Sequence, residues 1–372
     1  MQDWMLLIMT PRMSLKKWNA NGQLSRELNY YEELSKRSGL KLIIFSYGRN
    51  DGKYKLTQAV VLTMPGWIPK RIPYRIQNLL HNLFSVFFNK RIFQTVLISK
   101  TNQFSAANFG ALLKLIYGIP LVIRMGFYYT HFQNVSYMGK LSELLLFKFA
   151  DLILTTSKEA TEFISGKYNI RNSKILTICN SINLKRFLPL NCIKEWDVIF
   201  VAKLEEQKNI GIVLEVLGKV DGKVLIIGNG SLNYLVEEAV KNNCNIEWKK
   251  RVDNIDLPNY YNKSKCFTLL LDHEGNPKIL LEAMACGLPC VVTNVPGIRE
   301  CINHDINGII VPKDVAKISE AIKYLLSDKE KMEKIGKNAL DWIEIHRDYS
   351  KNIDREIKFY LDNKLCSKNY ES

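Results

Sequence analysis

The chain alternates short apolar runs with longer stretches in which apolar side chains recur every three or four residues. Trp4–Met9 is a continuous apolar run and predicts a buried strand. Thr10–Gly22 predicts a loop, Gln23–Ser38 a helix and Leu40–Tyr47 a second strand. Residues 53–78 are less regular, and further strands are predicted over Phe93–Ile98, Cys290–Thr293 and Ile309–Val311. The apolar stripe of that helix is formed by Leu24, Leu28, Tyr31 and Leu34. Strand, loop, helix and strand in this order are typical of a doubly wound α/β sheet.

The same alternation begins again in the second half of the chain. Trp196–Ala202 predicts a buried strand, Ile210–Leu217 a helix and Lys223–Ile227 another strand. We therefore predict two domains, residues 1–188 and 189–345, with a boundary near Pro189 and a tail over 346–372. The tail has an apolar stripe at helical spacing, formed by Ile353, Ile357, Tyr360 and Leu361.

A strand–loop–helix–strand unit in the second domain holds two carboxylates, Glu274 in the loop and Glu282 in the helix. Asn276 suits the N-cap of that helix and Pro277 its first position, while Gly287 suits its C-terminal cap. The helix N-terminus between the two carboxylates is a ready anion site. This order suits a nucleotide sugar, with Glu274 at sugar hydroxyls, the helix N-terminus at the diphosphate and Glu282 at ribose hydroxyls. The alternative is a solvated loop glutamate and a surface helix glutamate.

The residues around this pair, E-G-N-P-K-I-L-L-E-A-M-A-C-G-L-P-C-V-V over 274–292, resemble the donor-binding motif of family 4 of the retaining glycosyltransferases. The resemblance implies the α/β GT-B fold, two Rossmann-like domains facing each other across a cleft. It also implies that a C-terminal helix crosses back to the first domain, which the tail is suited to do. The positions that it adds to the two glutamates as donor-binding residues are Gly275, Asn276, Pro277, Lys278 and Ile279.

The family also has an Arg at the end of the first strand of the second domain and a Lys five residues later, both implied to bind the donor diphosphate. Lys203 and Lys208 occupy these positions. Lys203 keeps the charge but lacks the guanidinium fork. Two cations there would offset the charge of a leaving diphosphate, so both lysines are catalytic candidates with Glu274. Without the later motif, two solvated lysines would be the default interpretation.

Three further positions complete the predicted donor site. Gly22, in the turn before the first predicted helix, resembles the glycine loop of the family, although it also fits an ordinary turn. Arg124 ends a predicted strand and suits a phosphate or acceptor contact. Arg251 ends another strand, where nearby backbone would meet the base. Gly126 stands where family members often have a His, and His131 would replace it only if its loop folds back.

Charge separates the two predicted domains. Residues 1–187 carry 26 Lys and Arg against 9 Asp and Glu, and residues 52–142 carry eleven basic and no acidic residues. The apolar stretch Ile76–Phe88 has Arg75 before it and Lys90 and Arg91 after it. Such a helix suits a membrane of anionic lipids, and the alternative is a domain helix packed under a basic surface. Without helix-turn-helix, zinc or RNP-like signatures, nucleic acid is not an expected partner.

Cofactor and compartment signals are sparse. The eight cysteines show no metal or disulfide spacing, so we interpret them as small apolar side chains of a cytoplasmic protein. The motif Gly228-Asn229-Gly230 lacks the third glycine of an NAD fingerprint, and no Asp-x-Asp pair suggests a metal. We expect no signal peptide, transmembrane helix, cofactor or metal.

The predicted function is retaining transfer of a sugar from a UDP- or GDP-sugar to a saccharide acceptor. The acceptor is expected to be lipid-linked, at the inner membrane face, in cell-surface polysaccharide or glycolipid assembly. Two alternatives remain at this point: a nucleotide-sugar epimerase of related fold, and a polyanion- or membrane-binding protein with a degenerate site.

Overall fold

The computed structural model describes residues 3–54, 56, 59–126, 137–272 and 277–365 and divides into two compact units. Unit 1 comprises Met1–Cys179 and Ile353–Ser372, and unit 2 comprises Asn180–Asn352. The division follows Cys179, nine residues before the predicted end of the first domain at Leu188. The segment from Asn180 to Leu188 therefore belongs with the second unit.

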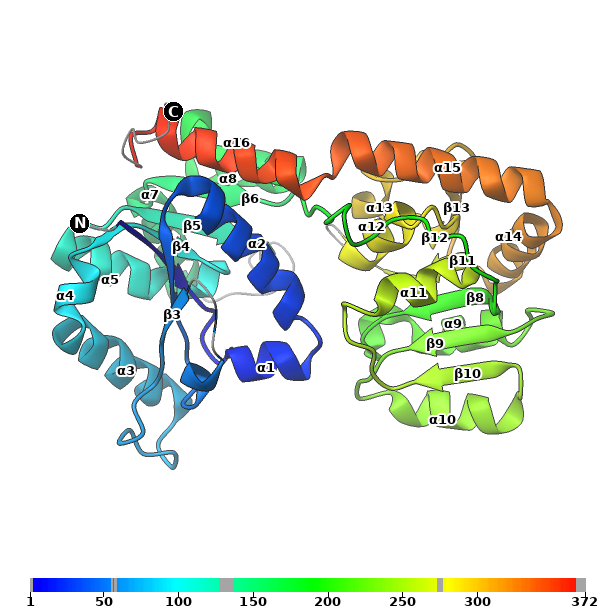
Figure 1. Cartoon of the computed structure of the whole chain (residues 1–372), viewed down its shortest axis with the longest axis horizontal. Helices are drawn as coiled ribbons and strands as arrows, with labels where there is room; N and C mark the ends of the chain where they lie inside the picture. Colours follow the sequence, from blue (N-terminus) through cyan, green and yellow to red (C-terminus); the bar gives the residue numbers. More distant parts are fainter. Residues whose placement is uncertain (1–2, 55, 57–58, 127–136, 273–276, 366–372) are drawn as a thin grey trace. The chain divides into compact units, whose positions relative to one another are not determined.

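Among the described residues, unit 1 contains a seven-stranded parallel sheet (Figure 1). Its order is β3 (Ala59–Leu62), β2 (Lys41–Phe45), β1 (Trp4–Ile8), β4 (Val96–Thr101), β5 (Leu121–Met125), β6 (Leu152–Thr155) and β7 (Ile175–Thr177). The helices of this unit are α1 (Leu15–Ala20), α2 (Leu24–Ser38), α3 (Tyr74–Phe88), α4 (Lys90–Phe93), α5 (Ala107–Tyr117), α7 (Tyr137–Phe149), α8 (Lys158–Tyr168) and most of α16 (Tyr349–Asp362).

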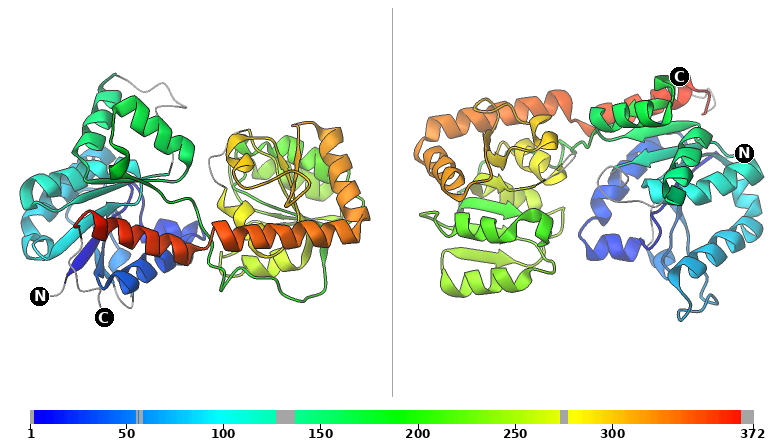
Figure 2. Two further views of the ribbon diagram at one scale, coloured as in Figure 1. Left: turned by 90° about the horizontal axis from the view of Figure 1, so that it is seen from above. Right: turned by 180° about the vertical axis from the view of Figure 1, so that it is seen from behind.

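Unit 2 repeats the arrangement with a six-stranded parallel sheet (Figure 2). Its order is β10 (Ile246–Lys249), β9 (Val224–Ile227), β8 (Trp196–Val201), β11 (Ser264–Leu269), β12 (Cys290–Thr293) and β13 (Ile309–Val311). Its helices are α9 (Ile210–Leu217), α10 (Asn233–Asn242), α11 (Leu257–Asn262), α12 (Lys278–Ala285), α13 (Pro296–Arg299), α14 (Val315–Ser327) and α15 (Lys329–His346).

Both faces of each sheet are buried, which explains the continuous apolar runs. In β1, Leu6 and Ile8 pack in the same apolar cluster as Val86 of α3 and Phe109 of α5. The alternate residues of that strand are as fully buried. Apart from its short 3₁₀ helices and α-helical turns, this layered arrangement is the α/β class that the sequence predicts.

The structure corrects three local predictions. The loop expected over Thr10–Gly22 contains α1, whose N-terminus is capped by Ser14 with its hydroxyl 3.0 Å from the amide of Lys17. The less regular region 53–78 contains edge strand β3. The strand expected over Phe93–Ile98 begins at Val96, because Lys90–Phe93 forms α4.

The C-terminal helix α16 is fixed to unit 1 by a buried ion pair. Glu356 lies against Lys100 of β4, and each side chain is 1% exposed. Tyr30 of α2 donates to the second Glu356 oxygen at 2.7 Å, and Tyr360 also donates to this carboxylate. Burial alone would raise the pKa of Glu356, but the charge and hydrogen bond of Lys100 and the tyrosine hydroxyls hold it below its ordinary value.

No helix within the described ranges is both long enough and apolar enough to cross a membrane.

Replacing Glu356 should loosen α16. Glu356→Gln leaves the buried Lys100 ammonium without its counter-charge, so we expect the free energy of unfolding to fall by about 3–5 kcal/mol. Asp354→Asn is the matched control, because its 2.6 Å pair with Arg37 is exposed and should contribute less than about 1 kcal/mol. Urea unfolding of both variants measures the difference, and equal losses would contradict this account.

His81 should make stability depend on pH. Burial lowers its pKa from 6.5 to about 4, so the folded state favours the neutral ring. The stabilisation is complete above pH 6.5 and is lost as the pH falls toward 4, by about 2 kcal/mol between pH 7 and pH 5. Unfolding titrations should show a flatter pH dependence in His81→Gln than in the wild type, and an unchanged pH dependence would contradict this account.

Candidate donor-binding site

The strand order of unit 2 fixes where a ligand can meet its loops. β8 and β11 are neighbours at the middle of the parallel sheet. β9 and β10 lie on the β8 side of this pair, and β12 and β13 lie on the β11 side. Open parallel sheets bind ligands at the carboxyl ends of the strands beside such a switch point. Lys203 and Lys208 follow β8, and Pro277, Lys278, Ile279 and Glu282 follow β11. These six predicted residues of unit 2 therefore follow the two strands beside the switch point.

The loop that carries Lys203 is held by close backbone packing. The amide of Leu204 donates to the carbonyl of Asn229 at 3.1 Å, and the amide of Leu232 donates to the carbonyl of Leu204 at 3.0 Å. A Cβ at Gly230 would lie 2.2 Å from the Leu204 carbonyl oxygen, and one at Gly228 would lie 1.9 Å from that of Ala202. The glycine pair thus supports the β8 loop rather than a dinucleotide.

The two lysines project from this anchored segment. The Lys203 side chain is 67% exposed and forms an ion pair with Glu205. Lys208 ends the short 3₁₀ helix Glu206–Lys208 and is half-buried. Asn209, at φ 50°, follows it and donates through its amide nitrogen to the carbonyl of Leu270 at 3.4 Å. That bond joins the loop after β8, which carries both lysines, to the residue that follows β11.

Glu282 is buried, with 1% of its surface exposed, so the alternative of a surface helix glutamate is wrong. Its Oε1 accepts a hydrogen bond from the Asn254 amide at 3.0 Å. Burial, the Glu282 charge and a hydrogen bond to Glu282 raise the pKa of Tyr261 well above its ordinary value. Arg186 donates to the Asn254 amide oxygen, so a cation, an amide and a carboxylate lie in one chain of hydrogen bonds.

Sequence reasoning missed Asn254, Tyr261 and Arg186 as parts of this network. Asn254 lies in the turn after β10, and Tyr261 is on α11. Nothing in their local pattern distinguishes them, because the contacts span 28 residues from Asn254 to Glu282 and 68 from Arg186 to Asn254. Arg186 had one signal, its place in the segment before Pro189 that resembles the interdomain segment of the family.

The start of α12 differs from the prediction by one residue. The helix begins at Lys278, and Pro277 occupies the cap position with φ −75° and ψ 103°. Lys278 is half-buried, and Ile279 packs against the core of unit 2. Gly287 follows the helix at φ 69°, as its predicted capping role requires. Glu274, Gly275 and Asn276 lie outside the described residues.

Arg251 lies near this network on the chain but is engaged in an exposed ion pair. Its guanidinium is 2.8 Å from the carboxylate of Asp253, the residue before Asn254. An ion pair of this kind contributes little and can be exchanged for a ligand. β10 ends at Lys249, so Arg251 lies in the loop two residues after the strand and not at its end, as was predicted, and its charge is compensated by Asp253.

The predicted residues of unit 1 lie in different surroundings. Gly22 is in the turn between α1 and α2 at φ 66°, a conformation that favours glycine. The Arg124 guanidinium lies 5.8 Å from the ring of Tyr30, beside the cluster that holds α16. Gly126 is exposed, its amide donates to Gln103 at 3.2 Å, and its carbonyl accepts from Thr156 at 3.3 Å. His131 lies outside the described residues.

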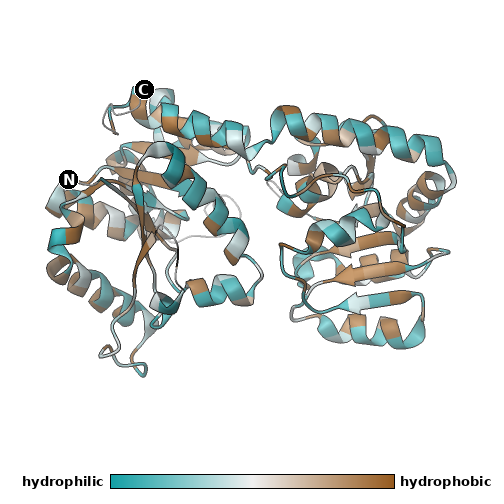
Figure 3. Ribbon diagram, in the orientation of Figure 1, coloured by the Kyte–Doolittle hydropathy of each residue, from teal (hydrophilic) through white to brown (hydrophobic). Residues whose placement is uncertain are grey.

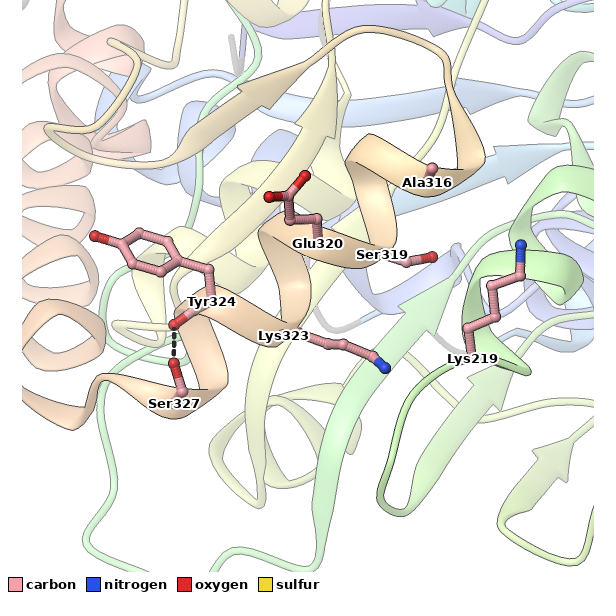
Figure 4. A pocket seen from close by; sticks show the side chains of 7 residues that line it. All are labelled: Lys219, Ala316, Ser319, Glu320, Lys323, Tyr324 and Ser327. Carbon is pink, nitrogen blue, oxygen red and sulfur yellow. Dashed lines mark hydrogen bonds between the residues drawn. The ribbon is translucent and has the colours of Figure 1, made fainter.

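A hollow of about 570 Å³ in unit 2 contains none of the predicted residues (Figure 4). Its lining comes from Lys219 and from one side of α14, including Ser319, Lys323 and Tyr324. In the part of the chain with described side chains, no group of three or more His, Cys, Asp or Glu could hold a metal ion. The seven cysteines described are free thiols, and burial raises the pKa of Cys266 to about 12.

Comparison with known proteins defines the class. In structure, HepE of Anabaena in complex with UDP and glucose is similar over 97% of this chain and 100% of that chain, with TM-score 0.75 and 16% identity. That likeness shows the fold alone, and it confirms the predicted α/β GT-B class. In sequence, residues 189–342 match the family described as glycosyl transferases group 1.

Two curated relatives are informative. The N-acetylgalactosamine-N,N'-diacetylbacillosaminyl-diphospho-undecaprenol 4-alpha-N-acetylgalactosaminyltransferase of Campylobacter jejuni is 29% identical over 59% of this chain and 64% of that protein. The UDP-Gal:alpha-D-GlcNAc-diphosphoundecaprenol alpha-1,3-galactosyltransferase of Escherichia coli is 24% identical over 71% of this chain and 75% of that protein. The match to the first of these spans less than two thirds of its length. Residues 189–342, which lie in unit 2, are therefore the part of the chain that is similar to the group 1 glycosyltransferases.

The Gly230 contact yields a test of the site. Gly230→Ala pushes a methyl group into the Leu204 carbonyl, so it should displace the Lys203 loop and weaken nucleotide binding by about tenfold or more. Gly211→Ala is the matched control, because its Cβ meets no atom within 4 Å and the change removes a helical glycine from α9. Calorimetric titration with UDP and with GDP compares the two. Equal affinities in both variants would show that the loop does not position a binding group.

Proposed function

We propose that the protein transfers a sugar from a nucleoside-diphosphate sugar to a saccharide acceptor with retention of the anomeric configuration. The observation that carries the proposal is the buried Glu282 network beside two lysines at the switch-point edge of unit 2. It is supported by the family of residues 189–342 and by the long motif that starts at Glu274.

In this proposal each group of unit 2 has one task toward the donor. Lys203 and Lys208 offset the charge of the diphosphate, together with the N-terminus of α12. Glu282 accepts hydrogen bonds from ribose hydroxyls, in exchange for or beside that of Asn254. Glu274 positions the transferring sugar, a role that follows from the resemblance only. Arg251 exchanges Asp253 for contact with the base.

The chemical balance is simple. The bond between the anomeric carbon and the diphosphate oxygen breaks, and the nucleoside diphosphate leaves with the electron pair. The acceptor hydroxyl oxygen forms the new bond to the anomeric carbon and releases its proton. Charge on the leaving diphosphate develops in the transition state, so cations preorganised at its oxygens accelerate the step without a resident metal.

The proposed acceptor is a lipid-linked saccharide at the cytoplasmic face of a membrane. Both relatives described above carry a diphospho-undecaprenol acceptor in their names. The excess of basic residues in unit 1 suits a diphosphate-bearing lipid. Whether the donor base is uracil or guanine is an outcome of the following test.

Binding of one nucleotide should depend on the named side chains and not on metal. We expect micromolar binding of UDP or GDP in EDTA, weakened about 10- to 100-fold by Lys208→Ala through loss of a charge-assisted contact. Glu282→Gln keeps the shape and should weaken binding about tenfold. Lys219→Ala is the control, since that exposed lysine forms only an i,i+4 pair with Glu215. Calorimetry of the full chain measures all four proteins.

Three results would change the proposal. If neither UDP nor GDP binds, the proposed donor site is refuted. If a nucleotide binds only when Mg²⁺ is present, the proposed metal independence is refuted. Conversion of a nucleotide sugar without acceptor would point to an epimerase instead. Retention is tested separately, by NMR of the anomeric proton of the first product.

A further inference from the structure

Helix α3 in unit 1 is amphipathic, but it buries polar side chains and exposes apolar ones. Its buried side includes Gln77, His81 and Ser85, whereas its exposed side is apolar. The exposed residues are Ile76, Leu79, Leu83, Phe87 and Phe88, between 40% and 74% exposed. Ile76, Leu79, Leu83 and Phe87 recur at intervals of three or four residues and so form one stripe, which Phe88 adjoins. Helices that cover a sheet usually bury their apolar stripe, so this orientation requires a cause.

The buried polar side chains hold α3 in this orientation. The Gln77 amide oxygen accepts from Arg49 at 2.9 Å, and its nitrogen donates to the carbonyls of Ile72 at 2.8 Å and Lys70 at 3.3 Å. His81 donates through Nε2 to the carbonyl of Ser46 at 3.1 Å. Rotating the helix to bury its apolar stripe would break these bonds. Their partners, among them the Ser46 carbonyl, would then be left unpaired against an apolar core.

His81 and Ser85 complete this polar seam. The Ser85 hydroxyl donates to Nδ1 of His81 at 3.4 Å, and the imidazole stacks on Phe45 of β2 with ring centroids 4.4 Å apart. Gln77, His81 and Ser85 thus each have a defined partner. The outward direction of the apolar stripe is therefore built into the fold and is not a consequence of loose packing.

The apolar stripe continues into the preceding loop. Trp67 is 57% exposed, and its ring centroid lies 5.3 Å from that of Phe84, which in turn stacks on Phe88 at 4.2 Å. We call Trp67, Ile76, Leu79, Leu83, Phe84, Phe87 and Phe88 the α3 face. Hydrophobic turns along α3 are visible in Figure 3.

Cations stand at both ends of the α3 face. Lys70, Arg71 and Arg75 precede or begin the helix, Lys90 and Arg91 follow it, and all five are exposed. No acidic residue occurs between positions 52 and 142. A second copy of the same face would bring like charges together, which disfavours self-association. An apolar stripe with basic ends complements a surface of anionic headgroups over acyl chains.

We propose that the α3 face docks unit 1 onto a bilayer that contains anionic lipids. The 15-residue helix is about 22 Å long, too short to span a bilayer but suited to lie along its surface. Phe87, Phe88 and Leu79 enter the boundary between headgroups and acyl chains, and the five cations contact lipid phosphates. This deepens the proposed function, on which it rests for its biological setting, by naming the surface on which the acceptor is met.

The test is sedimentation of the full chain with vesicles of phosphatidylcholine containing 30% phosphatidylglycerol, and with pure phosphatidylcholine. The wild type should bind the anionic vesicles and lose most of that binding in 0.5 M NaCl. Phe87→Ser/Phe88→Ser should reduce the partition coefficient by about tenfold or more. Tyr234→Ser/Ile345→Ser is the matched control, because it removes two comparably exposed apolar side chains from unit 2. That variant should bind as the wild type does.

Each other outcome overturns the proposal. No binding of the wild type, equal binding to neutral vesicles, or undiminished binding by the α3 double variant would each refute docking through this face. A dimer in light scattering that the double variant abolishes would assign the face to self-association. Thermal unfolding checks that the variant is folded. UDP and GDP titrations of the same variant should match the wild type, so failure of docking and failure of the donor site are distinguishable.

Discussion

Parallel pairing of strands is the constraint on which the rest of this structure depends. Each strand pair needs a crossover helix, so both faces of each sheet are covered and the strand interiors hold only apolar or fully paired side chains. Ligand chemistry is thereby confined to the loops at the strand ends. In unit 2 the Asn209 side chain links the loop after β8 to the carbonyl of Leu270, which directly follows β11. Glycine is required at positions 228 and 230 because the backbone there packs directly against the carbonyl groups of Ala202 and Leu204.

Two buried glutamates show how context gives the same side chain different tasks. Glu356 is surrounded by a cation and two tyrosine hydroxyls, which use its lone pairs to hold α16 against unit 1. Glu282 accepts a hydrogen bond from the Asn254 amide, and Asn254 accepts one from the Arg186 guanidinium. Burial alone therefore does not distinguish the two carboxylates, and the groups around each of them do.

The sequence predicted elements best where the pattern was local. Ile210–Leu217, Cys290–Thr293 and Ile309–Val311 have the predicted limits, because each is a dense apolar run between clear turn residues. Edge strand β3 was missed because its apolar run, Ala59–Leu62, is only four residues long and lies in an otherwise irregular region. The Asn254–Glu282 contact was missed because it joins segments 28 residues apart and has no periodic signature. The resemblance supplied the candidate donor-site residues of unit 2, whereas hydropathy and charge supplied only the sheets and the basic half.

Helix α3 shows what such patterns leave undecided. Its sequence shows an apolar helix with basic ends, which suits either a buried core helix or a surface one. The choice depends on Gln77, His81 and Ser85, whose partners Arg49, Ser46 and the loop before α3 come together only in the folded unit. Because those polar groups form their hydrogen bonds on the inner side, large aromatic side chains are left on the outer side. Their exposed apolar area is unfavourable for a monomer in water. A fold that retains both features is consistent with a surrounding that is apolar and anionic together. Burial of polar groups at one side of a helix can therefore indicate a partner at its other side.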